Sequence, residues 1–200
     1  MSVERIRAPI GRRTAILAAL GLLLAAALTF GLVRALAPRG PLAPDFTLTD
    51  QDGRPYRLAD QLGHPVALFF GYTHCPDVCP TTLAALARAK KQLGAAGAHF
   101  AVVFVTVDPH RDTPAVVRRY VRLFDPTFVG LTGTPAQLEP VYTAYHIYHQ
   151  NLPAHGSAAG YIVAHSSIVD FIGPRGRLRG FGDWSDTPDQ LAQRMKQAES

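Results

Sequence analysis

Apolar residues along this chain fall into one long run and several short ones, separated by polar segments. The long run covers residues 14–33, where twenty consecutive positions carry no charge and most are Leu or Ala. A helix needs about 20 such residues to cross a hydrocarbon core of roughly 30 Å. The pattern therefore predicts one transmembrane helix over residues 14–33.

Two shorter apolar runs, Val66 to Phe70 and Phe100 to Val107, are rich in β-branched and aromatic residues. Continuous apolar runs of this kind are typical of central strands that are buried on both faces. The intervening segment predicts a helix from Thr81 to about Leu93. Strand, helix and strand together form a βαβ unit.

Three later segments begin with the same dipeptide, at Thr113-Pro114, Thr134-Pro135 and Thr187-Pro188. Threonine is a favourable N-cap residue, and proline is well suited to the first turn of a helix. Gln137 and Gln190 stand three residues after the second and third of these threonines, which completes a capping box in each case. The three dipeptides therefore predict three helix starts.

The remaining strands are predicted from turn signals. Asp52-Gly53 lies between the short runs 46–48 and 56–58 and indicates a β-hairpin. A short strand is expected at 128–131, and a second hairpin at 167–172 and 178–181. Residues 145–156 hold three histidines and are interpreted as a polar surface loop rather than a site for a divalent ion.

This order of elements predicts an α/β fold, a thioredoxin-like sandwich with an N-terminal β-hairpin extension, preceded by one transmembrane helix. The predicted organisation has four parts along the chain. They are a basic cytoplasmic N-terminus (1–13), a transmembrane anchor (14–33), a Pro/Gly/Ala linker (34–43) and one thioredoxin-like domain (44–200).

Charge predicts how the anchor is oriented. Four arginines and a single Glu4 precede the apolar run, so the positive-inside rule places the N-terminus in the cytoplasm and the domain across the membrane. A cleaved signal peptide is the alternative, because Ala35-Leu36-Ala37 supplies a cleavage site, but the apolar run is longer than the usual 7–15 residues. Thirteen residues leave no room for a mitochondrial transit peptide, which favours a bacterial inner membrane with the domain in the periplasm.

The net charge of +5 comes entirely from residues 1–40, which hold six arginines and one glutamate. The other 160 residues carry fourteen basic and fourteen acidic side chains. Because residues 41–200 have neither net charge nor a stripe of basic side chains, the sequence gives no support for nucleic-acid binding.

Cys75 and Cys79, the two cysteines of the chain, lie in a proline-flanked segment between the first buried strand and the following helix. We expect Pro80 at the first helical position, which places Cys79 near the N-cap, where backbone N–H groups and the helix dipole favour a thiolate. Two such thiols can close a disulfide or bind one soft ion such as Cu(I). Spacing alone leaves both chemistries open.

Several motifs together resemble the SCO/SenC family. They are Pro44-Asp45-Phe46-Thr47-Leu48, Gly71-Tyr72-Thr73-His74-Cys75-Pro76-Asp77-Val78-Cys79-Pro80-Thr81-Thr82, Asp108-Pro109-His110-Arg111-Asp112-Thr113-Pro114 and His165-Ser166-Ser167. The resemblance extends over nearly the whole exported part and implies a thioredoxin-like fold.

It also implies a function. In the family, two cysteines and one distant histidine bind copper for delivery to the binuclear copper centre of cytochrome c oxidase subunit II. By position these ligands are Cys75, Cys79 and His165. A second family role is thiol-disulfide exchange by the same two cysteines, which form a redox-active pair that keeps the target cysteines reduced. Another periplasmic copper chaperone is an expected partner.

The residue chemistry agrees with this resemblance, since two thiolates and an imidazole suit Cu(I) and also accommodate Cu(II). Alone, His165 would be interpreted as a core or edge histidine at the start of a predicted strand, and only the motif makes it a ligand. Asp108 follows the second buried strand and has two interpretations, as a brace for the turn to Thr113 or as a residue that tunes the copper site from behind the ligands.

Three functions are compared. The first is a membrane-anchored copper metallochaperone, which does not need to catalyse turnover. The second is an enzyme, a thiol-disulfide reductase in which one cysteine attacks a target disulfide and the other resolves it, and for which His165 is dispensable. A peroxiredoxin-like peroxidase is disfavoured, because it needs a threonine three residues before its cysteine and Thr73 is only two before Cys75.

Overall fold

The computed structural model describes residues 12–36, 40–153 and 160–199. The chain divides into two compact units, Met1–Pro38 and Arg39–Ser200.

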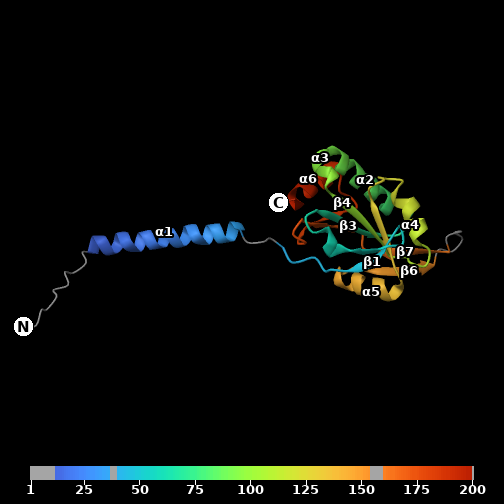
Figure 1. Ribbon diagram of the computed structural model, residues 1–200, viewed down its shortest axis with the longest axis horizontal. Helices are drawn as coiled ribbons and strands as arrows, with labels where there is room; N and C mark the ends of the chain where they lie inside the picture. The colour runs from blue at the N-terminus through green and yellow to red at the C-terminus, as the bar shows by residue number, and fades with distance from the viewer. Residues whose placement is uncertain (1–11, 37–39, 154–159, 200) are drawn as a thin grey trace, which may run out of the picture. The chain divides into compact units, whose positions relative to one another are not determined.

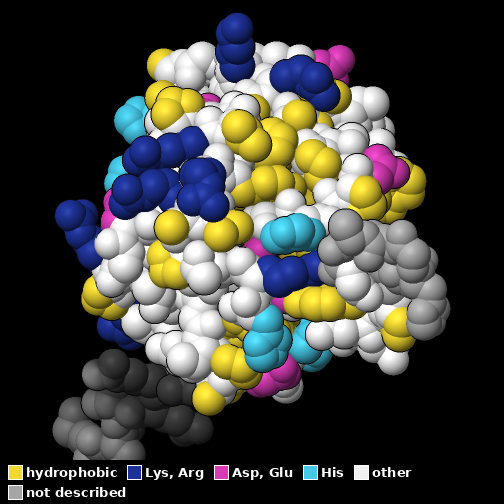
Figure 2. Space-filling view, turned by 90° about the vertical axis from the view of Figure 1, so that its right-hand side faces the viewer, with side chains coloured by type: hydrophobic (Ala, Val, Ile, Leu, Met, Phe, Trp, Pro, Cys, Tyr) yellow, Lys and Arg dark blue, Asp and Glu magenta, His cyan; other side chains and the backbone are white. Residues whose placement is uncertain are grey.

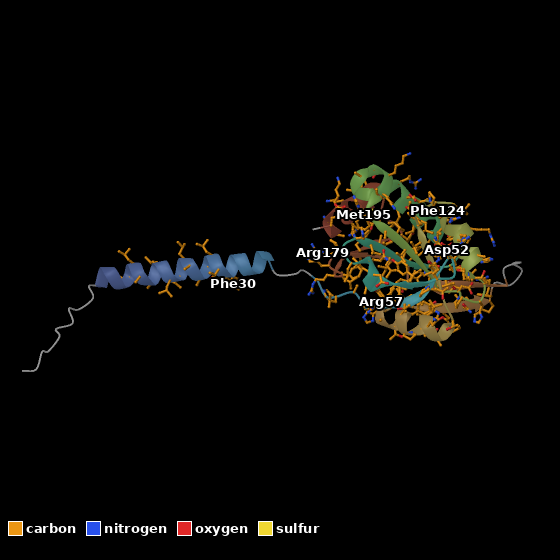
Figure 3. The ribbon with its side chains drawn as sticks, in the orientation of Figure 1. Phe30, Asp52, Arg57, Phe124, Arg179 and Met195 are labelled. Carbon is orange, nitrogen blue, oxygen red and sulfur yellow. The ribbon has the colours of Figure 1, made fainter. Side chains whose placement is uncertain are left out.

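The first unit contains one helix, α1 (Arg12–Leu36), which includes the predicted span 14–33. Side chains from Ile16 to Phe30 are exposed all round it, and Figure 3 labels Phe30. Within the described ranges, no helix is both long enough and apolar enough to cross a membrane. The anchor stays a prediction, and most of the predicted N-terminus, as well as residues 37–39 of the linker, lies outside the described residues.

The second unit is built on a seven-stranded mixed sheet with the order β2-β1-β5-β4-β3-β8-β9. Figure 1 labels β1, β3 and β4 of this sheet. Its parallel centre is formed by β3, β4 and β5, while β1, β8 and β9 pair antiparallel. The strands are β1 (Thr47–Asp50), β2 (Pro55–Arg57), β3 (Val66–Gly71), β4 (Ala101–Thr106), β5 (Val129–Thr132), β8 (Ile168–Ile172) and β9 (Leu178–Asp183).

Helices cover both faces of this sheet, with α2, α3 and α6 above it and α5 below it in the view of Figure 1. They are α2 (Val78–Gln92), α3 (Ala95–Ala98), α4 (Pro114–Val121), α5 (Pro135–Ala144) and α6 (Pro188–Ala198), and a 3-10 turn, η1, spans Leu58–Gln61. Successive residues of β3 point to opposite faces, so Phe69 packs against Phe104 and Phe70 against Tyr142 of α5. Both phenylalanines are fully buried, which explains the unbroken apolar run in the sequence.

These features confirm the predicted thioredoxin-like α/β sandwich. The β1–β2 hairpin is present as well and extends the sheet beyond β5. The predicted helix starts are confirmed at Pro114, Pro135 and Pro188, and both capping boxes form. Met195 of α6, labelled in Figure 3, is fully buried and belongs to the core.

Two predictions about the region before His165 were wrong. The polar surface loop predicted at 145–156 instead contains β6 (His149–Pro153), which pairs with β7 (Tyr161–His165) as a separate two-stranded sheet. His165 consequently ends a strand, where a strand start was expected. The residues of β6 have little intrinsic strand propensity, so its conformation depends on pairing with the apolar β7. Residues 154–159, including His155, lie outside the described residues.

The cysteine-bearing helix also begins earlier than predicted. Asp77 is the N-cap of α2 and Val78 its first residue, so Cys79 lies inside the first turn and Pro80 at the third helical position. The first N–H groups of a helix have no partner within it, and proline at this position therefore removes no helical hydrogen bond.

Candidate metal centre

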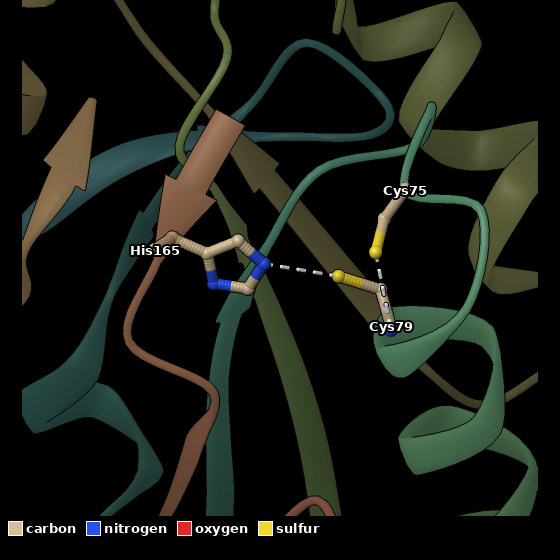
Figure 4. A group of neighbouring side chains, drawn as sticks. All are labelled: Cys75, Cys79 and His165. Atoms are coloured by element: carbon tan, nitrogen blue, oxygen red, sulfur yellow. Dashed lines mark hydrogen bonds between the residues drawn. The ribbon is translucent and has the colours of Figure 1, made fainter. Parts of the chain in front are cut away.

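Cys75 and Cys79 lie on either side of the turn that joins β3 to α2 (Figure 4). Cys79 is fully buried, whereas 9% of Cys75 is exposed. The backbone N–H of Cys79 donates to the Sγ atom of Cys75 over 3.4 Å. The first turn of α2 thus directs an N–H group and the positive end of its dipole at the outer sulfur.

His165 reaches the cysteines from the end of β7. Its Nε2 atom lies 3.4 Å from the Sγ atom of Cys79, and its Nδ1 atom lies 2.9 Å from the carbonyl oxygen of Ser166. Because a carbonyl can only accept, Nδ1 carries the proton in this contact. The lone pair of Nε2 is then directed at the sulfur, as a metal-ligating imidazole requires.

Tyr72 and Gly71 border the imidazole of His165 and the sulfur of Cys79. The ring of Tyr72 meets the imidazole of His165 edge to face, with centroids 5.6 Å apart and an interplanar angle of 89°. A Cβ atom on Gly71 would lie 2.8 Å from the Sγ atom of Cys79, so glycine is required for the sulfur to occupy its position. Gly71 was not recognised as a site residue from the sequence.

The two thiols have unequal acidity. The thiol of Cys79 hydrogen-bonds to the sulfur of Cys75 and lowers the pKa of Cys75 from 9.0 to about 4. The same hydrogen bond, together with burial and the negative charge on Cys75, raises the pKa of Cys79. Cys75 is therefore the thiolate of the reduced pair, and Cys79 carries the proton.

Behind the cysteine turn, a buried carboxylate joins three segments. Asp112 accepts hydrogen bonds from the backbone N–H of Thr73 over 3.0 Å, from the Thr73 hydroxyl over 2.6 Å and from the Thr106 hydroxyl over 2.6 Å. It therefore ties the cysteine turn to the end of β4. Asp112 belongs to the motif that begins at Asp108, but its role cannot be inferred from the sequence, because its partners lie up to 39 positions away in the chain.

Asp108 is nearly fully buried and binds two side chains beside the site. Its Oδ1 atom accepts a 2.7 Å hydrogen bond from the hydroxyl of Tyr161 on β7, and its Oδ2 atom pairs with Arg111. Asp108 thus acts both as the expected brace of its own turn and as a link to the strand that carries His165.

The three candidate ligand atoms, two Sγ and one imidazole nitrogen, lie within 4.8 Å of one another. In the described part of the chain, no other group of three or more His, Cys, Asp or Glu side chains approaches this closely. Soft thiolates with one imidazole suit Cu(I) and can hold Cu(II), whereas a structural zinc site usually has four protein ligands. Figure 2 shows the face of the unit that carries α4, β6 and β7, where histidine side chains lie among apolar ones.

Comparison with known proteins gives concordant results. The SCO1/SenC family model matches residues 34–199. The chain is 37% identical over 154 residues to the mitochondrial SCO2 homologue of Bos taurus, an alignment that covers 76% of this chain but only 58% of the bovine protein.

Two solved structures of copper-bound ScoI are similar as well. The protein from Bradyrhizobium japonicum superposes with a TM-score of 0.71 at 34% identity, covering 79% of this chain and 99% of that one. For the protein from Arabidopsis thaliana the TM-score is 0.72 at 32% identity, with coverage of 78% and 98%. On its sequence and its fold alike, this chain belongs to the SCO1/SenC family.

Proposed function

We propose that this protein is a copper metallochaperone that binds one copper ion through Cys75, Cys79 and His165. The observation that carries the proposal is the convergence of the three ligand atoms within 4.8 Å. Copper-bound relatives with the same fold support it. Copper is the cargo of such a protein, which must hold the ion tightly enough to carry it and release it to an acceptor.

The donor set fits both tasks. Three protein ligands leave a soft ion open to a further thiolate from a partner, so copper can pass between proteins by ligand exchange without a free-ion intermediate. Cys75, the more exposed and more acidic thiol, is the ligand that a partner reaches first. Cys79 is buried beneath it and holds the ion until the exchange is complete.

We further propose that the acceptor is the binuclear copper centre of cytochrome c oxidase subunit II and that the donor is another periplasmic copper chaperone. The family resemblance supports this assignment. The uncharged run 14–33 and the arginines before it support an inner-membrane anchor with the copper-binding domain in the periplasm. Anchoring would hold the domain at the same membrane as its acceptor.

The second candidate is a thiol-disulfide reductase, and the unequal thiols favour it. The thiolate of Cys75 would attack a target disulfide and release one target thiolate, and Cys79 would then displace the second by forming the Cys75–Cys79 disulfide. The target gains two electrons and the cysteine pair loses two. His165 has no part in this chemistry.

Titration with copper separates the two functions. Cu(I) and Cu(II) are added without oxygen to the reduced unit Arg39–Ser200 and to its His165→Ala variant. We expect one tightly bound copper per chain in the unsubstituted protein, and a loss of affinity and of the sulfur-to-Cu(II) charge-transfer band in the variant. Weak binding in the unsubstituted protein, or equal binding in His165→Ala, would reject the metallochaperone function and favour the reductase.

A further inference from the structure

The third ligand of the candidate centre lies on a different sheet from the cysteines. Cys75 and Cys79 follow the central strand β3, whereas His165 ends β7, which pairs only with β6 among the described strands. No ladder of backbone hydrogen bonds fixes the β6–β7 hairpin to the main sheet in the described ranges. The two-residue connection to β8 and side-chain contacts must therefore hold β7 in place, and the side-chain contacts set where its far end lies.

Several such contacts gather at the opposite end of β7. The guanidinium of Arg111 lies over the ring of Tyr161, with its central carbon 3.7 Å from the ring centroid. The Nη1 atom of Arg111 donates to the carbonyl oxygen of Tyr161 over 3.1 Å. Asp108 completes the arrangement, since it pairs with Arg111 and accepts from the Tyr161 hydroxyl.

Arg111 also faces the cysteine side of the site. Its guanidinium carbon lies 5.8 Å from the centroid of the Tyr72 ring, and Tyr72 is the residue whose ring contacts His165. Tyr72 directly follows β3, three residues before Cys75. The guanidinium is therefore placed between one ring from the cysteine segment and one ring from the histidine strand.

The geometry of a strand transmits this contact to the ligand. Residues two apart share a face, so Tyr161, Val163 and His165 all point toward the same side of β7. Val163, the middle residue of the three, is buried. Tyr161 and Val163 are the first and third residues of β7, and a strand held at both positions can neither rotate nor slide. The position of His165, the fifth residue, is then fixed as well.

We propose that Arg111 and Tyr161 form a clamp that positions His165 opposite the two cysteines, an inference that rests on the proposed copper-binding function. Both are positioning residues, because they act through β7 and Tyr72. The planar guanidinium is needed, since it stacks on a ring while it donates to a carbonyl and a carboxylate. Lysine has the charge but not this geometry.

Tyr161→Leu in the full chain is the main test, because it removes the stacked ring and the hydroxyl but retains a large apolar side chain. Arg111→Lys tests the guanidinium while keeping a cation beside the buried Asp108. Tyr148→Leu is the matched control, since Tyr148 precedes the same hairpin, is 57% exposed and bonds through its hydroxyl to Gln150. Substitution of groups that orient metal ligands typically lowers metal affinity 10–100-fold.

We expect Tyr161→Leu and Arg111→Lys to lose about 10-fold or more in Cu(II) affinity and to shift the Cu(II) spectrum toward that of His165→Ala. Tyr148→Leu should match the unsubstituted protein. In a His165→Ala background, Tyr161→Leu should cause no further loss, because the clamp acts only through His165. Unchanged affinity in the clamp variants, or a loss that adds in full to that of His165→Ala, would overturn the clamp.

A measurement on the copper-free chain keeps the clamp testable if copper binding itself fails. Amide hydrogen exchange should be faster in β6 and β7 of Tyr161→Leu than in the unsubstituted protein, with β3 and β4 unchanged. The reaction of Cys75 with a small aromatic disulfide should remain unchanged in Tyr161→Leu, since Tyr161 makes no contact with Cys75 and the hydrogen bond from the Cys79 N–H to the Cys75 sulfur is retained. Equal exchange of the hairpin amides in both proteins would refute the clamp whether or not copper binds.

Discussion

At the scale of single residues, Cys75 and Cys79 differ in chemistry although they lie only four positions apart. The N–H of α2 and the thiol of Cys79 both donate to the sulfur of Cys75, so negative charge collects on the outer atom of the pair. A partner protein or an alkylating reagent therefore meets a thiolate at neutral pH, and the buried thiol stays protonated until the outer sulfur has reacted.

Alkylation of the reduced protein with iodoacetamide tests this asymmetry. Because the pKa of Cys75 is lowered to about 4, we expect its alkylation rate to be nearly constant from pH 6 to pH 8 and to fall only as the pH approaches 4. Peptide mapping should find the label on Cys75. The Cys79→Ala variant lacks the donating thiol, and its Cys75 should become less reactive at pH 6 than at pH 8. A rate at Cys75 that rises steadily through pH 8 in the unsubstituted protein would contradict the assignment.

A second residue, Asp170, is a destabilising group in the core. It lies at the centre of β8 between Leu68 of β3 and Phe181 of β9, only 5% exposed, and burial raises its pKa from 3.8 to about 7. The folded state holds this proton more tightly than the unfolded chain does. The stability that protonation provides is present below the unfolded pKa and is lost as the pH rises through the folded one.

Asp170→Asn should therefore stabilise the protein at alkaline pH. We expect its free energy of unfolding at pH 8 to exceed that of the unsubstituted protein by up to about 4 kcal/mol, with no difference near pH 4. Urea denaturation at both pH values measures this. Asp60→Asn, at an exposed position of η1, serves as the control. An equal gain at both pH values would show that Asp170 does not titrate in this range.

At the scale of elements, the helices that the sequence predicted well are those whose starts are marked by residues next to each other in the chain. Each threonine-proline pair places an N-cap and a first-turn residue side by side, and α4, α5 and α6 begin where these pairs stand. Such signals need no tertiary contact. The caps differ, however, because the Thr187 hydroxyl accepts from the Gln190 N–H over 3.3 Å, whereas the side chain of Thr113 makes no capping hydrogen bond at the start of α4.

This difference predicts unequal effects of two matched substitutions. Thr187→Ala should lower the free energy of unfolding by about 1 kcal/mol, because the first turn of α6 loses a hydrogen bond to its N–H groups. Thr113→Ala should lower the free energy of unfolding by clearly less, because no capping hydrogen bond is lost. Chemical denaturation of the two variants under the same conditions compares them, and equal losses would show that the capping hydrogen bond of α6 contributes nothing.

The β6–β7 hairpin shows where sequence reasoning stops at this scale. The polar residues of β6 carry no alternating pattern, and they become a strand only by pairing with β7. The contact between His165 and Cys79, the brace at Asp112 and the stacking of Arg111 on Tyr161 likewise join residues 39 to 86 positions apart. The candidate ligands were predicted through a family motif, whereas the residues that support them became visible only in the fold.

At the scale of the whole folded unit, the candidate centre joins two sheets that share no backbone pairing among the described strands. A copper ion held by Cys75, Cys79 and His165 would link the turn after β3 to the end of β7. Binding to the folded state alone stabilises that state by RT ln(1 + [L]/Kd), which is about 4 kcal/mol when free copper is 1,000 times Kd.

Copper should therefore raise the melting temperature of the reduced unit Arg39–Ser200, by on the order of 10 °C at that saturation. The rise should be smaller in His165→Ala, where the ion no longer reaches the hairpin, and a Cu(I) chelator should reverse it. The oxidised protein is the internal control, because a Cys75–Cys79 disulfide offers no thiolate, and its melting temperature should not respond to copper. If the reduced and oxidised forms responded alike, the ion would be binding elsewhere, and the two sheets would not be joined through this centre.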